Sequence, residues 1–174
     1  RGRAEADALA DWLAGRSPDR LVTSDLERAV ATADRVAAAT DVDAAPDRAW
    51  RERDYGFLQG LPAEEAFERF GRFSLARGEA ALAERPDGGE SIQEFANRVE
   101  AAWNRLCADL DDETAVVVAH GGVLRVVGAL VTERSLLDVF RDTSPGNCAV
   151  TEVSVRDAGT AVVREAATDH LSPG

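Results

Sequence analysis

The sequence contains no methionine and no lysine, and it has only two cysteines and two histidines. Two cysteines, Cys107 and Cys148, are too few for a disulfide framework or a cysteine-rich zinc site. We therefore expect free thiols that pack as small apolar side chains, and no metal. The sequence also lacks an apolar run long enough to cross a bilayer, and a secretory signal at its start. These absences favour a cytoplasmic protein.

Because lysine is absent, arginine supplies all 20 basic side chains, against 32 acidic ones, and the formal net charge is −12. A surface this acidic repels nucleic acids and anionic membranes at long range, so we expect neither as a partner. High ionic strength screens the self-repulsion of such a surface, so the composition is typical of a halophilic protein. An ordinary acidic protein from a GC-rich genome is the alternative.

The 174 residues, 45% of them hydrophobic, fit a single domain over residues 1–174. A chain of this size buries roughly 70% of its unfolded surface without help from disulfides or metals. The sequence opens on an amphipathic helix, with Leu9, Trp12 and Leu13 on one face and with Gly15 and Pro18 after its end. Because neither a strand nor a methionine precedes this helix, we expect a fragment that lacks an N-terminal segment.

The rest of the chain alternates between predicted strands and helices. Strands are predicted at 20–24 and at 114–120, the latter buried on both faces, and a hairpin at 148–155 and 160–166 around "RDAG". Helices are predicted at about 25–39, 63–76, 91–110 and 122–131. Ser24 and Glu27 have the spacing of a capping box. This order predicts an α/β fold, a three-layer α/β/α sandwich with a mostly parallel sheet and an antiparallel C-terminal hairpin.

One of the two histidines, His120, stands at the end of the predicted strand 114–120 and is followed by Gly121 and Gly122. Ligands of open α/β sheets bind beyond the carboxyl ends of the strands. The helix that follows points its N-terminus at the same place, and its free N–H groups favour an anion. The alternative is a histidine that a backbone carbonyl satisfies, with glycines that serve only the turn.

Two further residues fit an anion site. Arg28 lies in the first turn of a predicted helix, where a cation opposes the helix dipole unless an anion sits beside it. Its guanidinium can hold a phosphate through two hydrogen bonds, although a pairing with Asp25 or Glu27 is the alternative. Glu52, in "RERDYGFLQGLP" (51–62), can present a carboxyl group that binds its proton tightly beside phosphate and donates it to a leaving oxygen. The alternative is that Glu52 is one of many solvated carboxylates in a surface loop and has no role in a site.

Together these stretches resemble a known family. The order "TSDLERAVATA", "RERDYGFLQG", "RPDGGES" and "VVVAHGGVLR" is similar to the histidine phosphatase superfamily, also called phosphoglycerate mutase-like, and "PGNCAVTEV" (145–153) resembles its closing strand. The resemblance implies a phosphohistidine mechanism without a metal or an organic cofactor. It implies that His120 is the second active-site histidine and Arg28 the second phosphate-binding arginine. Glu52 would then be the acid that protonates the leaving group, and the N–H of Gly121 would be a further phosphate donor.

The sequence departs from this family at one point. The family's nucleophilic histidine lies in an Arg-His-Gly motif at the end of the first strand, and that motif is absent here. The missing segment would supply the nucleophile, a first phosphate-binding arginine and the central strand of the sheet. His170 lies in a polar C-terminal tail, where we expect it to be solvated or packed against the tail. We therefore expect this peptide not to form the phosphoenzyme, and its parent protein to form it.

The function that the resemblance implies is hydrolysis of a small phosphorylated metabolite. The segment from Gly60 to Gly88 is short compared with the insertion of the cofactor-dependent mutases, and an open site favours hydrolysis. A phosphoglycerate mutase is the alternative, since "ERDYGFLQGL" resembles the mutase branch. A non-catalytic phosphate-binding or partner-binding module is the third reading, if the nucleophile segment is truly absent. The sequence leaves a homodimer open.

Overall fold

The computed structural model describes residues 2–156 and 159–171. The strands are β1 (Arg20–Thr23), β2 (Ala44–Pro46), β3 (Ala115–Val118), β4 (Val150–Arg156) and β5 (Gly159–Ala167). The helices are α1 (Gly2–Ala14), α2 (Glu27–Thr40), α3 (Ala63–Arg69), α4 (Ile92–Asp109), α5 (Gly121–Thr132) and α6 (Leu136–Asp142). Short 3₁₀ turns lie at Arg48–Trp50, Gly56–Leu58, Gly71–Phe73, Leu75–Ala81 and Asp169–Leu171. No helix in these ranges is long and apolar enough to span a bilayer.

The strands form two sheets. The first is parallel, in the order β2-β1-β3, with Leu21 opposite Ala44 on one side and opposite Val116 on the other. The second is the antiparallel hairpin of β4 and β5, which confirms the predicted C-terminal hairpin. The turn residues Asp157 and Ala158 lie outside the described part of the chain.

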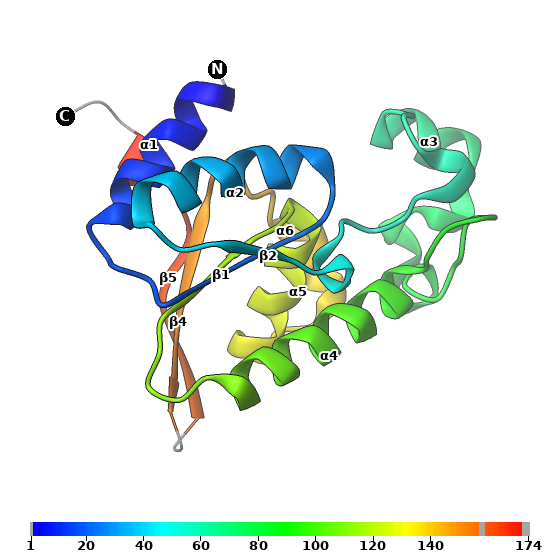
Figure 1. The fold of residues 1–174 in the computed structure, drawn as a ribbon. Coiled ribbons are helices and arrows are strands. Elements are labelled where there is room, and N and C mark those ends of the chain that lie inside the picture. Colours follow the sequence, from blue (N-terminus) through cyan, green and yellow to red (C-terminus); the bar gives the residue numbers. More distant parts are fainter. Residues whose placement is uncertain (1, 157–158, 172–174) are drawn as a thin grey trace.

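Helices cover both faces of the parallel sheet, as the predicted three-layer arrangement requires. Alternate residues of a strand point to opposite faces. Leu21 of β1 packs with α1 and α2, whereas the next residue, Val22, packs with α4 and α5. Figure 1 shows α1 and α2 on one side of the sheet and α4 and α5 on the other, with α3 projecting beyond one end of α4.

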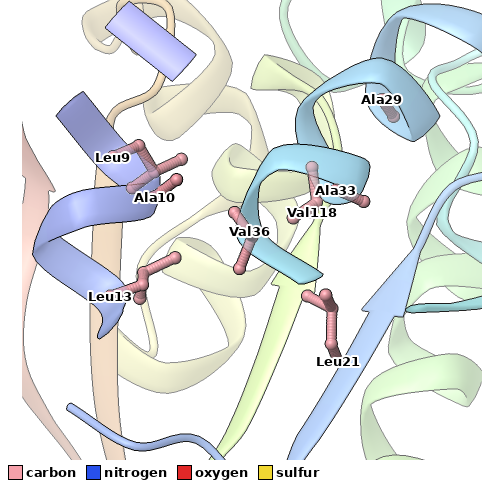
Figure 2. Close-up of a cluster of buried hydrophobic side chains, with 8 residues drawn as sticks. All are labelled: Leu9, Ala10, Leu13, Leu21, Ala29, Ala33, Val36 and Val118. Carbon is pink, nitrogen blue, oxygen red and sulfur yellow. The ribbon is translucent and has the colours of Figure 1, made fainter. Parts of the chain in front are cut away.

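The first core lies between the sheet and the helices α1 and α2, which are drawn in Figure 2. Its buried residues come from α1, α2, β1 and β3: Leu9, Ala10, Leu13, Leu21, Ala29, Ala33, Val36 and Val118. Ala29, Ala33 and Val36 recur at helical spacing on one face of α2. The small alanine side chains allow α1 and α2 to approach each other closely, and this packing fixes the position of the α2 N-terminus near the carboxyl end of β1.

The second core lies under α4 and α5 and is built around Phe95, Val99, Val126 and Trp50. Helix α4 begins at Ile92 with Ser91 as its N-cap, within one residue of the predicted start. The Ser91 hydroxyl accepts from the N–H of Glu94 at 3.1 Å, and the Glu94 carboxylate accepts from the N–H of Ser91 at 2.8 Å. This capping box satisfies two N–H groups at the start of the helix.

The capping box predicted for Ser24 and Glu27 is wrong. Helix α2 begins at Glu27, with Leu26 as its N-cap and without a side-chain cap. The backbone N–H of Ser24 instead donates to the carbonyl of Val118 at 2.9 Å, so Ser24 continues the pairing of β1 with β3. Its hydroxyl accepts from the N–H of Leu26 at 3.3 Å and lies buried at the end of the strand.

Four other elements differ from the prediction. Strand β2 and helix α6 were not predicted, because a three-residue strand and a seven-residue helix are too short to show a period. The helix predicted at 63–76 ends at Arg69 and continues as 3₁₀ turns. Strand β3 was predicted to be buried on both faces, but only Val118 is buried, since the strand borders an open cleft.

This cleft has a volume of about 1410 Å³. All of β3 and residues Val150–Val155 of β4 line it, together with apolar residues of α1 and α5. Within the described ranges β3 pairs only with β1, and β4 only with β5, so each strand turns a free edge to the cleft.

Candidate active site

Two polar side chains meet at the carboxyl end of the parallel sheet. Because β1 and β3 are adjacent and in register, with Thr23 opposite Val118, the residues that follow them emerge side by side. Ser24 follows β1, and His120 lies two residues after β3. The Nε2 atom of His120 and the hydroxyl of Ser24 are 2.8 Å apart, and His120 is only 8% exposed.

Arg28 reaches the same imidazole from the first turn of α2. Its Nε donates to Nδ1 of His120 at 3.2 Å. A guanidinium can only donate, so Nδ1 is the acceptor and the imidazole proton lies on Nε2, toward Ser24. Asp25, one of the two alternative partners of Arg28, is instead held by Arg51, with Nη2 of Arg51 2.7 Å from Oδ2 of Asp25. Across the described chain, the terminal nitrogens of Arg28 have no hydrogen-bond partner.

The surroundings of His120 keep its imidazole neutral. Burial lowers the pKa of His120 from its ordinary value of 6.5 to about 4, and the positive charges of Arg28 and Arg98 act in the same direction. The carboxylate of Glu52 opposes this shift. At neutral pH His120 therefore has one proton, which it can donate to a single oxygen acceptor.

Glu52 comes from the irregular segment between the 3₁₀ turns Arg48–Trp50 and Gly56–Leu58. Its Oε2 accepts from the N–H of Gly122 at 3.1 Å and its Oε1 from the N–H of Arg53 at 2.8 Å. A Cβ atom at position 122 would lie 2.2 Å from Oε1 of Glu52 and 3.2 Å from the ring of Phe95. Glycine at this position therefore allows the carboxylate to reach the N-terminus of α5, where the helix dipole favours it.

Four residues singled out in the sequence border one cleft. Arg28, Glu52, His120 and Gly121 all line the cleft described above, although they come from three distant stretches of the chain. His170 does not take part in this arrangement. Its Nε2 lies 3.0 Å from the carbonyl of Cys148 and its ring lies 5.1 Å from that of Trp12, so it packs against α1 and the residues before β4, away from the cluster of Arg28, Glu52 and His120.

The arrangement is suited to a tetrahedral oxyanion. The guanidinium of Arg28 and the N-terminal turn of α5 supply donors and positive potential, His120 lies beside Arg28 with its Nε2–H toward Ser24, and Glu52 adds a carboxyl group. No cluster of three or more His, Cys, Asp or Glu side chains within residues 2–156 and 159–171 has the arrangement of a metal site. Cys107 and Cys148 are free thiols, half-buried rather than fully buried.

A comparison with protein families gives a match along nearly the whole chain. The model of the histidine phosphatase superfamily, branch 1, matches residues 1–168. The chain belongs to this superfamily. The resemblance of the five sequence stretches is thereby confirmed.

Curated relatives of this histidine phosphatase superfamily member include phosphatases and mutases. It is 31% identical to the metal-independent phosphoserine phosphatase of Arabidopsis thaliana, over 98% of this chain and 71% of that protein. It is 35% identical to phosphoglycerate mutase-like protein 4 of Arabidopsis thaliana, over 71% of this chain and 55% of that protein. It is 32% identical to 2,3-bisphosphoglycerate-dependent phosphoglycerate mutase 2 of Gloeobacter violaceus, over 73% and 60% of the two chains. The chain thus spans little more than half the length of two of these relatives.

Solved structures of the superfamily share the fold. The mycobacterial glucosyl-3-phosphoglycerate phosphatase in complex with inorganic phosphate aligns with a TM-score of 0.82 and 27% identity, over 98% of this chain and 87% of that chain. Bacillus stearothermophilus YhfR aligns with a TM-score of 0.86 at 22% identity, over 98% and 84%, and shows the fold alone.

Sequence reasoning missed three contributors to the site of this superfamily member. Ser24 was interpreted as a helix cap, although its place after a strand parallel to the one before His120 could have indicated the contact. The N–H of Gly122 donates to Glu52, whereas the sequence analysis gave a donor role only to Gly121. Arg98, whose charge acts on His120, lies on α4 without any local sequence signal.

Proposed function

We propose that this chain is part of a phosphomonoester hydrolase that acts on a small phosphorylated metabolite through a phosphohistidine intermediate. The observation that carries the proposal is the convergence of Arg28, His120 and Glu52 with the N-terminus of α5 on one cleft. The names of the relatives support it, since one is called a metal-independent phosphoserine phosphatase and another a glucosyl-3-phosphoglycerate phosphatase.

In the proposed reaction a neutral nucleophilic imidazole attacks phosphorus, and the bond from phosphorus to the leaving oxygen breaks. Arg28, His120 and the N–H of Gly121 bind the equatorial oxygens and stabilise the charge that develops there. The Glu52 carboxyl donates its proton to the leaving oxygen. The resulting carboxylate then takes a proton from the water that attacks the phosphohistidine, and cleavage of the P–N bond frees phosphate.

The nucleophile in this scheme comes from a segment that the sequence does not contain. We propose that an N-terminal segment with an Arg-His-Gly motif lies as a strand in the cleft between β3 and β4. Three observations support this placement: both strands have free edges, the cleft wall includes apolar residues of α1 and α5, and Arg28 and His120 lie where β1 and β3 end. By this proposal the 174-residue chain alone forms no phosphoenzyme.

The test compares two proteins, the 174-residue chain and the chain extended by the residues that its gene encodes upstream of Arg1. Both are assayed at high salt on a panel of phosphomonoesters that includes both phosphoglycerates. We expect the extended protein to release phosphate and to form an acid-labile phosphoenzyme, and its His120→Ala variant to lose about 10²-fold or more in turnover. An extended protein without turnover, or one whose His120→Ala variant keeps normal turnover, would contradict the proposal.

A phosphoglycerate mutase is the second candidate, favoured by the relative from Gloeobacter violaceus and by the stretch "ERDYGFLQGL". Interconversion of the two phosphoglycerates that is faster than phosphate release would establish it. A start codon immediately before Arg1, together with phosphate binding but no turnover, would instead establish a non-catalytic phosphate-binding module.

The composition supports two further proposals. From the net charge of −12 we infer a cytoplasmic protein adapted to high salt. Unfolding experiments from low to molar salt test the adaptation, since screening of the acidic surface should raise the midpoint of thermal unfolding. Light scattering on the same samples separates a monomer from a homodimer.

A further inference from the structure

One arginine of α4, Arg98, holds the backbone of the segment that bears Glu52. Nη1 of Arg98 donates to the carbonyl of Ala49 at 2.9 Å and to that of Arg51 at 3.1 Å. Nη2 of Arg98 reaches the carbonyl of Glu52 at 3.4 Å. A single guanidinium therefore binds three carbonyls within four residues, including that of Glu52 itself.

Glu90 fixes the guanidinium in turn. Its Oε1 accepts from Nε of Arg98 at 2.8 Å and its Oε2 from Nη2 at 2.7 Å, a two-fold pairing that sets the plane of the guanidinium. The two side chains are 26% and 24% exposed, so this pair is less solvated than the other ion pairs of the described chain. Burial acts to raise the pKa of Glu90, but the hydrogen bonds from Arg98 and from the N–H of Asp54 outweigh it and lower the pKa. Glu90 is therefore ionised at neutral pH.

The loop that bears Glu90 also contacts the Glu52 segment directly. Asp54 exchanges two hydrogen bonds with Glu90: its N–H donates to Oε2 at 3.1 Å, and its carbonyl accepts from the N–H of Glu90 at 2.8 Å. Nε of Arg53 donates to the carbonyl of Glu90 at 2.9 Å. Gly56 and Gly89 allow the two loops to approach, since a Cβ at Gly89 would lie 2.5 Å from the carbonyl of Asp54.

We propose that Arg98 and Glu90 are positioning residues for the Glu52 carboxyl group. They hold the backbone on both sides of Glu52, so that its carboxyl stays at the N–H of Gly122 in the first turn of α5. Neither residue lines the cleft, so each acts through Glu52 and not on the substrate. The catalytic consequence rests on the proposed function, because a displaced acid loses the alignment that proton transfer needs.

The first experiment measures the consequence in the extended protein. Arg98→Lys keeps the charge but cannot bind three carbonyls and a carboxylate in one plane. We expect it to lower kcat on an alkyl phosphate by about 10- to 100-fold, to lower kcat on an aryl phosphate much less, and to leave KM nearly unchanged. The aryl leaving group needs little protonation, so the split between the two substrates reports on the acid.

Arg105→Ala is the matched control. Arg105 lies two turns further along α4 and pairs with Asp47 at 2.7 Å, but it contacts none of the three carbonyls. We expect its kinetics to equal those of the wild type, since an exposed ion pair contributes little. Equal losses on both substrates in Arg98→Lys, or no loss on either, would overturn the proposal.

The second experiment needs no enzymatic activity and uses the 174-residue chain. The N–H groups of Arg53 and Gly122 both donate to the Glu52 carboxylate, so their hydrogen exchange reports its position. In Arg98→Lys we expect both amides to exchange about 10-fold faster, while the amide of Ser24 in the β1–β3 ladder keeps its rate. Glu90→Gln, which weakens the guanidinium pairing, should show a smaller effect in the same direction and replaces Arg98→Lys if the latter does not fold.

Unchanged exchange of both amides in these variants would refute the positioning role, whatever the enzyme does. Absence of phosphatase activity in the wild-type extended protein would instead refute the proposed function, and the exchange measurement would still decide the positioning role. The two failures are therefore distinguishable.

Discussion

The contact between Arg28 and His120 gives the sharpest prediction about the site. Because Nε of Arg28 donates to Nδ1 of His120, the imidazole should be neutral at pH 7 with its proton on Nε2. Burial is the largest cause of its lowered pKa of about 4, and the charge of Arg28 is the next. Arg28→Ala removes the charge of Arg28 but leaves most of the burial of the imidazole.

The size of the pKa change expected in Arg28→Ala follows from the distance between the guanidinium and the imidazole. Unit charges about 4 Å apart interact by about 1 kcal/mol in water and by about 4 kcal/mol at an effective dielectric constant of 20. Arg28 is exposed, so the lower part of this range applies, and about 1.4 kcal/mol corresponds to about one pKa unit. At pH 5 His120 should then be about one tenth protonated in the wild type, and about half protonated in Arg28→Ala.

Nitrogen NMR on the imidazole rings measures both the tautomer and the protonation. The chain has only two histidines, so His120→Gln assigns the signals and His170 serves as an internal reference. Arg35→Ala is the control, because Arg35 lies two turns along α2 and pairs with Asp7 at 2.9 Å. A wild-type proton on Nδ1, or the same titration of His120 in Arg28→Ala as in the wild type, would refute this description of the site.

Four other predictions concern the site and its energetics. In the extended protein, Glu52→Gln should lower turnover of an alkyl phosphate by about 10²-fold or more and that of an aryl phosphate less; equal losses would argue against an acid role. Gly122→Ala should displace Glu52, since its Cβ would lie 2.2 Å from Oε1, and should reproduce the Glu52→Gln kinetics while the circular dichroism spectrum stays native; normal kinetics would show that the contact is dispensable. The pKa of His120 is lowered from 6.5 to about 4, so the unfolded state binds this proton more tightly. The contribution of His120 to the free energy of unfolding should therefore be fully present above pH 6.5 and should fall by about 3 kcal/mol as the pH drops to about 4. Urea unfolding of His120→Gln should lack this pH-dependent contribution. EDTA should leave the phosphatase rate unchanged, and inhibition that zinc or magnesium reverses would contradict the reaction scheme.

Local patterns in the sequence determined much of the secondary structure. The apolar spacing of α2 and the capping box of α4 are local, because each involves residues at most one helical turn apart. The alternation of helices and strands gave the α/β class, and the valine run before His120 placed that residue at the end of a strand. The three side chains proposed for the site could therefore be named, since each stands beside a local signal: a helix start, a glycine turn or a strand end.

Only the tertiary structure decided how these residues contact one another. Ser24 satisfies the pattern of a helix cap, yet pairing of β1 with β3 places it against His120, 96 residues away in the chain. Arg98 has no local sequence signal, and Glu90 stands in the stretch "RPDGGES", which by itself does not indicate a contact with Arg98. The packing of α4 against the Glu52 segment brings the two side chains together. The cleft likewise depends on the tertiary structure, which places β3 and β4 along its walls. Periodicity and capping depend on neighbours along the chain, whereas these contacts depend on which surfaces the folded core brings together, and that information is spread over the whole sequence.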